Sequence, residues 1–71
     1  MTPQELIRVQ NYMRKVFGTK TLSVRARPKI KDSAEVYVGE EFIGTLTREE
    51  DEGELCYQFQ MAILELDLEE A

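Results

Sequence analysis

The sequence predicts an α+β fold, in which one N-terminal helix packs on a four-stranded antiparallel meander sheet in two layers, in the order α-β-β-β-β. Three observations predict it. Apolar residues recur at helical spacing in the first 17 residues, later segments alternate apolar and polar residues, and Gly and Pro separate these segments. The 71 residues fit a single small domain, 1–71, which buries only about 60% of the surface of its unfolded chain.

Residues 2–17 are the predicted helix. Thr2 suits the N-cap, Pro3 suits the first helical position, and Glu5 completes a capping box with Thr2. Gly18 suits a left-handed C-cap. The apolar side chains of this helix fall on one stripe, which we expect to face the sheet: Leu6, Val9, Met13, Val16 and Phe17.

Alternating apolar and polar residues predict the first three strands over 21–27, 34–38 and 42–47. Pro28 ends the first strand, because proline cannot donate a ladder hydrogen bond. The Gly39-Glu40 pair suits a two-residue type II′ turn between the second and third strands.

Two registers are open for this hairpin. The two-residue turn pairs Tyr37 with Phe42. It places one apolar strip, Tyr37, Phe42 and Leu46, on the sheet face opposite a second strip of Ala34, Val36, Val38 and Ile43. A three-residue loop would instead gather Val36, Val38, Phe42 and Leu46 on one side. Turn chemistry favours the first register, and segregation of apolar residues favours the second.

The last part of the chain predicts an acidic loop over 48–54 and a fourth strand over 55–64. Leucines alternate with acids over 64–68, so we expect the strand to resume there in the other phase. A helix is the alternative, because one helical face would carry Leu55, Phe59, Ala62, Ile63 and Leu66, and Gln, Met, Ala, Leu and Glu are good helix formers. We favour the strand, because Glu69 and Glu70 would lie at the negative end of a helix.

The composition excludes much chemistry. The chain has no His and a single Cys, so imidazole bases, internal disulfides and thiolate clusters are excluded. We expect no catalytic residue, no cofactor and no metal, since the acidic loop lacks the spacing of a calcium loop. Cys56 is expected to be a buried or half-buried structural thiol. With no membrane span and no signal peptide at the start, the expected location is the cytoplasm.

Charge is distributed unevenly along the chain. Residues 1–31 carry eight basic residues and one acid, whereas residues 32–71 carry one basic residue and thirteen acids. This asymmetry fits internal screening, a partner surface, or pairing between subunits. Four cations would project to one side of an extended segment and offer a site for phosphate or an acidic partner: Arg25, Arg27, Lys29 and Lys31.

Two long segments carry a resemblance to a known family. They are 31–44, KDSAEVYVGEEFIG, and 57–64, YQFQMAIL, which follows the acid-rich loop. The opening Met1-Thr2-Pro3 and the Arg27-Pro28-Lys29 segment fit as well. With these features the chain resembles a small bacterial family catalogued as domain of unknown function 3126. The resemblance implies a stand-alone bacterial cytoplasmic protein and brings no activity, ligand or catalytic residue.

These features predict a non-enzymatic protein-interaction module, either a homo-oligomer such as a homodimer or a protein that docks on a partner. The expected interface is the apolar strip of Tyr37, Phe42 and Leu46, because exposed apolar strips often mark interfaces. The alternative is RNA binding through the basic segment 25–31, which the acidic half of the chain disfavours by repelling phosphate.

Overall fold

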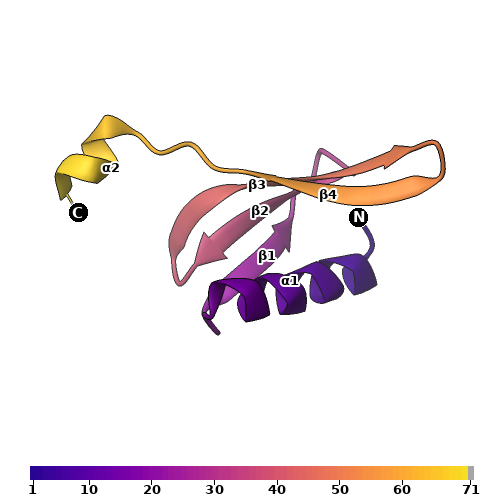
Figure 1. The fold of residues 1–71 in the computed structure, drawn as a ribbon, viewed down its shortest axis with the longest axis horizontal. Helices are drawn as coiled ribbons and strands as arrows, with labels where there is room; N and C mark the ends of the chain where they lie inside the picture. Colours follow the sequence, from indigo (N-terminus) through magenta and orange to yellow (C-terminus); the bar gives the residue numbers. More distant parts are fainter. Residues whose placement is uncertain (71) are drawn as a thin grey trace.

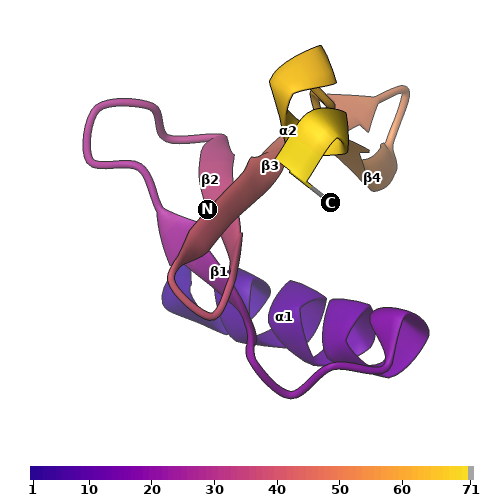
Figure 2. The ribbon, with the colours of Figure 1, turned by 90° about the vertical axis from the view of Figure 1, so that its left-hand side faces the viewer.

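The computed structural model describes residues 1–70, which form two helices and four strands (Figure 1). The strands form one open antiparallel sheet in the order β1-β2-β3-β4, and α1 lies on one of its faces (Figures 1 and 2). This confirms the predicted α+β meander. In chain order the elements are α1 (Pro3–Phe17), β1 (Leu22–Ala26), β2 (Ser33–Val38), β3 (Glu41–Asp51), β4 (Glu54–Gln60) and α2 (Glu65–Glu70).

Both ends of α1 are capped as the sequence predicts. The Thr2 hydroxyl accepts a hydrogen bond from the Glu5 backbone N–H at 3.1 Å, and the Glu5 carboxylate accepts one from the Thr2 N–H at 3.0 Å. Gly18 ends the helix with a left-handed φ of 67° and donates its N–H to the Arg14 carbonyl. These local bonds satisfy backbone groups that a helix end leaves unpaired.

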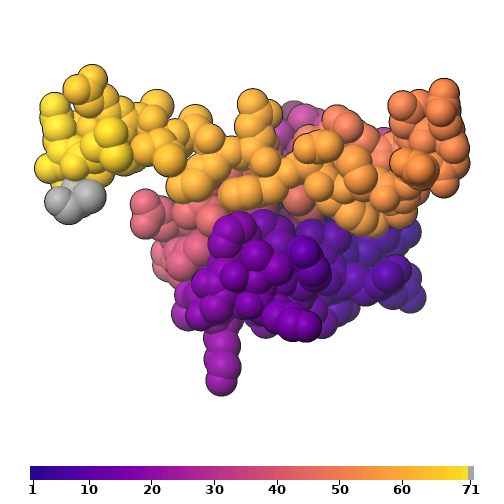
Figure 3. Space-filling model, viewed as in Figure 1, coloured from indigo at the N-terminus to yellow at the C-terminus, as the bar shows by residue number. Residues whose placement is uncertain are grey.

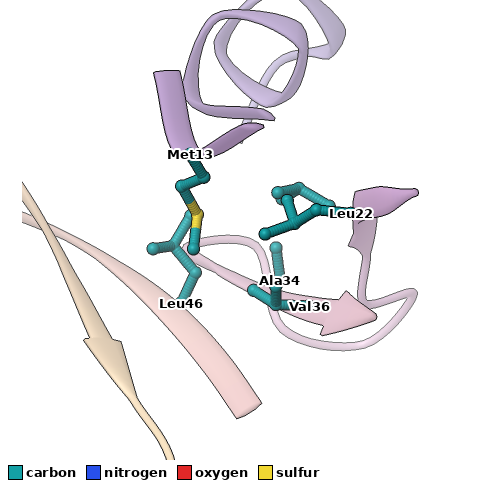
Figure 4. Close-up of a cluster of buried hydrophobic side chains, with 6 residues drawn as sticks. Met13, Leu22, Ala34, Val36 and Leu46 are labelled. Carbon is teal, nitrogen blue, oxygen red and sulfur yellow. The ribbon is translucent and has the colours of Figure 1, made fainter. Parts of the chain in front are cut away.

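The core lies between α1 and the inner face of the sheet, which is the face that α1 covers. α1 packs directly on β1. Of the helix residues only Met13 is fully buried, because the helix covers only part of the sheet. Met13 meets side chains of the first three strands (Figure 4), and the buried apolar set is Met13, Leu22, Val24, Ala34, Val36 and Leu46.

The hairpin between β2 and β3 combines features of both open registers. The turn is the two-residue Gly39-Glu40, with a φ of 61° at Gly39, and Tyr37 pairs with Phe42. The register then shifts, so Val36 pairs with Gly44 rather than with Ile43. The extra residue makes a β-bulge, and such a bulge reverses the side to which the following residues point.

The bulge corrects the prediction for Leu46. We expected this side chain on the face opposite the helix, beside Tyr37 and Phe42. After the bulge Leu46 pairs with Ala34 and points into the core, where it is only 2% exposed. Leu46 is therefore unavailable to a partner.

The acidic segment 48–54 is mostly strand rather than loop. β3 and β4 stay paired as far as Asp51 and Glu54, and only Glu52 and Gly53 form the turn. Both turn residues have positive φ, 50° and 83°, which is the geometry of a type I′ turn. The hairpin therefore extends beyond the part of the sheet that α1 covers (Figure 1).

The strand predicted over 61–68 is wrong. β4 ends at Gln60, which pairs with Thr45, and α2 begins at Glu65. Further pairing would have to continue past Gly44 onto the bulged backbone at Ile43, where the ladder is disrupted. The helix start is stabilised locally, because the Asp67 carboxylate accepts the Leu64 N–H at 3.0 Å.

Residues 61–70, here called the C-terminal arm, project from the body of the domain. Figure 3 shows the arm as an extension at one end of the molecule, and Figures 1 and 2 place α2 away from α1. The extents of the chain are 42 × 23 × 22 Å. Every residue of the arm is exposed. Within residues 1–70, neither helix has the length and apolar character that crossing a membrane requires.

Candidate protein interface

An apolar groove runs between α1 and β4 on the inner face of the sheet. It has a volume of about 560 Å³. It forms because α1 packs on β1, at one edge of the sheet, and leaves the inner side of β4 at the other edge without a covering element. Tyr12 is 66% exposed although it lines the groove. The apolar side chains there that solvent still reaches are Tyr12, Val16, Phe17, Leu55 and Phe59.

Two contacts between α1 and β4 hold the walls of the groove together. At the C-terminal end of α1, the rings of Phe17 and Phe59 meet edge to face with centroids 6.2 Å apart. Near the N-terminal end, Glu5 accepts hydrogen bonds from the Tyr57 hydroxyl at 2.6 Å and from Arg48 Nε at 2.9 Å. α1 is therefore tied to the long β3–β4 hairpin at both of its ends.

The Glu5 cluster shifts the pKa values of its members. Hydrogen bonds from the Thr2 backbone N–H and the Tyr57 hydroxyl, together with Arg48, lower the pKa of Glu5 from 4.5 to about 2. The carboxylate in turn raises the pKa of Tyr57 above its usual range, because ionised Tyr57 could no longer donate to it. Sequence reasoning gave Glu5 only a capping role, although Arg48 is the single basic residue of the acidic half.

The helix side of the groove is apolar except for one cation at its margin. Arg8 lines the groove, and Lys15 follows it by seven residues, which is close to two helical turns, so both lie along one side of α1. Glu5 is the only acidic residue of α1, and it is engaged by Arg48 and Tyr57. The groove thus combines an apolar floor with a positive margin.

The outer face of the sheet, opposite α1, carries a smaller apolar patch than predicted. Tyr37 and Phe42 pack edge to face with centroids 5.6 Å apart, and Phe42 is 50% exposed. The Arg25 guanidinium lies over the Tyr37 ring at 3.9 Å and covers one face of it. With Leu46 in the core, the expected interface strip is reduced to two aromatic rings. The residues that share this face by register are mostly polar, among them Glu35, Thr45, Thr47, Gln58 and Gln60.

The four predicted phosphate-binding cations do not lie along one extended strand. Only Arg25 belongs to β1, which ends at Ala26 before Pro28. Arg27 donates to the Ser33 hydroxyl at 3.4 Å across the following loop, and Lys29 and Lys31 are exposed on that loop. The proline ends the strand as expected, and the chain then turns instead of continuing the alternation.

Cys56 corrects another expectation. Its side chain is exposed rather than buried. Its partner in the ladder is Glu49, and the Gln58 amide donates to its sulfur at 3.5 Å. Among residues 1–70, no three His, Cys, Asp or Glu side chains are grouped so that they could hold a metal ion.

The fold and the groove define a class of protein: a small α+β domain with an open antiparallel sheet and an uncovered apolar groove at its β4 edge. The chain belongs to the family described as protein of unknown function (DUF3126), whose model matches residues 5–67. The match covers α1 from Glu5 onward, the whole sheet and the start of α2. No match was found among curated proteins or solved structures.

Proposed function

We propose that the protein is a non-enzymatic protein-interaction module that self-associates through the α1–β4 groove. The observation that carries this proposal is the groove itself, a continuous concave surface in which Tyr12, Val16 and Phe17 are more than half exposed. Contiguous apolar surface of this kind is costly to hydrate and is typical of interaction sites.

The test compares two substitutions on the same helix. Val16 lines the groove and is 58% exposed, whereas Ile7 is 57% exposed and lies outside the groove. Val16→Glu and Ile7→Glu therefore introduce the same charge at equally exposed helical positions. Light scattering coupled to size exclusion, over a range of concentrations, should show that Val16→Glu shifts the protein toward the 8.3 kDa monomer while Ile7→Glu leaves its mass unchanged. A wild-type protein that stays monomeric at every concentration would contradict self-association.

RNA binding through Arg25, Arg27, Lys29 and Lys31 is the less supported alternative. Base stacking needs an open aromatic face, and Arg25 occupies one face of Tyr37. We expect no salt-sensitive binding when the protein is titrated with mixed RNA at low and moderate salt. Binding that weakens steeply with salt and disappears in an Arg25→Ala, Arg27→Ala variant would favour the RNA function instead.

A further inference from the structure

We infer that the occupant of the groove is the C-terminal arm of a second copy of this chain. Each copy would donate its arm and receive the arm of its partner, which gives a closed two-fold dimer. This inference rests on the proposed function, and it adds the identity of the segment that fills the groove.

The arm has the apolar surface that such a groove requires. The arm leaves the sheet after Gln60, where Met61, Ala62 and Leu64 border a pocket with Phe42 and Ile43 at the start of β3. Leu66 is 60% exposed, and α2 has no buried residue. Large side chains that are about half exposed or more run through the arm: Met61, Ile63, Leu64, Leu66 and Leu68. Five large apolar side chains exposed within eight residues are unusual for a monomeric protein.

The charges of the arm complement those of the groove. The arm carries Glu65, Asp67, Glu69 and Glu70 and no basic residue, whereas Arg8 lines the groove and Lys15 lies on the same side of α1 as Arg8. Such rim pairs contribute little to affinity when exposed, but they orient a ligand and disfavour partners of the wrong sign. The C-terminal arm of a second copy has both the apolar side chains and the acidic residues that would match this groove.

The direction of the arm favours a second copy over its own groove. The arm continues past the end of β4, and α2 lies beyond that end (Figure 1). To enter its own groove the chain would have to reverse direction within residues 61–64, which span at most about 14 Å when extended. The projection seen in Figure 3 instead leaves the arm accessible to a second copy.

The test uses full-length variants and measures dimer dissociation by analytical ultracentrifugation. Leu66→Glu places a charge in the arm, and Ile30→Glu is the matched control at an exposed apolar residue outside both the arm and the groove. We expect Leu66→Glu to weaken dimerisation about tenfold or more and Ile30→Glu to leave it unchanged. A Leu66→Glu protein that dimerises like wild type would overturn the arm exchange while leaving groove-mediated self-association intact. A monomeric wild type would instead refute the proposed function itself.

Mixing the variants shows whether arm and groove meet each other. Val16→Glu has a damaged groove and an intact arm, and Leu66→Glu has the reverse. At a protein concentration where this weakening leaves each variant monomeric alone, their mixture should form a heterodimer, because one intact arm meets one intact groove. A mixture that remains monomeric, although each variant keeps the wild-type circular dichroism spectrum, would overturn the inference.

A charge exchange provides a second readout. Replacing Arg8 and Lys15 with Glu should weaken the dimer, and mixing this variant with a Glu65→Lys, Asp67→Lys variant should restore association between the two. Restoration that decreases with added salt supports an arm that lies beside Arg8 and Lys15. Restoration that fails at low salt, with both variants folded, counts against it.

Discussion

Gly44 is the position where a single methyl group should most directly test the packing of β3 against β4. A Cβ at this residue would lie 2.5 Å from the Gln60 carbonyl oxygen and 2.8 Å from a ring carbon of Phe59. The nearer atom belongs to the backbone, so it cannot move aside without separating β4 from β3 at its last paired residue. Gly44 is buried, so the added methyl group has no route to solvent.

We therefore expect Gly44→Ala to destabilise the domain. Overpacking of a well-packed interior costs about 1–3 kcal/mol. For a domain of this size each kcal/mol lowers Tm by about 4–8 °C, so the decrease should be roughly 5–20 °C. A domain of fewer than about 70–80 residues rarely has more than about 3–5 kcal/mol of stability, so urea titration at low temperature should accompany the thermal scan.

The control for Gly44→Ala is Thr47→Ala, a change on the same strand at an exposed residue on the outer face. Thr47→Ala should lower the free energy of unfolding by less than about 1 kcal/mol, which is the whole range of strand propensities among residue types. If Gly44→Ala is as stable as wild type to within about 0.5 kcal/mol, β4 does not approach β3 as closely as the structure places it, and the reasoning fails.

Four other predictions test the structure. Leu46→Ala should lower the free energy of unfolding in urea by about 2–4 kcal/mol, because the Leu46 side chain is buried. Phe42→Ala removes a half-exposed ring and should lower it clearly less. Equal decreases for the two variants would contradict the bulged register. Glu5 has a folded pKa of about 2 against 4.5 for the free group, so its contribution to the stability of the fold should be complete above pH 4.5 and lost as pH falls toward 2. A Glu5→Gln variant should lack this part of the pH dependence. If the urea midpoints of wild type and variant run parallel across that pH range, the ion cluster is refuted. The single thiol, Cys56, should react fully with a thiol reagent in the native protein, and protection until unfolding would show that it is buried. Glu52 has a φ of 50°, so Glu52→Asn should raise Tm, because Asn tolerates this conformation better; a lower Tm would argue against the type I′ turn.

The groove and the arm have the same origin in the fold. α1 is a 15-residue helix lying over the β1 side of the sheet, and the β3–β4 hairpin extends past the region that it covers. One helix of this length cannot cover the inner face of four strands, so the β4 edge retains uncovered apolar surface. A second copy would supply the missing cover without any additional element in the chain.

Local sequence determined the elements that depend only on neighbouring residues. The helix and its two caps were predictable, because Thr2, Glu5 and Gly18 act within one turn of the backbone. The positions of the first three strands and the Gly39-Glu40 turn were also predictable from alternation and turn chemistry. Tyr37 and Phe42 were correctly placed opposite each other by the same reasoning.

Only the tertiary structure decided the remaining features, because each depends on residues far apart in the chain. The bulge at Ile43 moves Leu46 into the core and lies beside the last pair of β3 and β4, yet alternation of residue types does not show where a ladder gains an extra residue. Glu5 meets Arg48 and Tyr57 across 43 and 52 residues, so a residue that looks like a simple helix cap also anchors the distant hairpin. The groove likewise exists only because one helix lies over one side of a wider sheet, and no run of amino acids encodes that offset by itself.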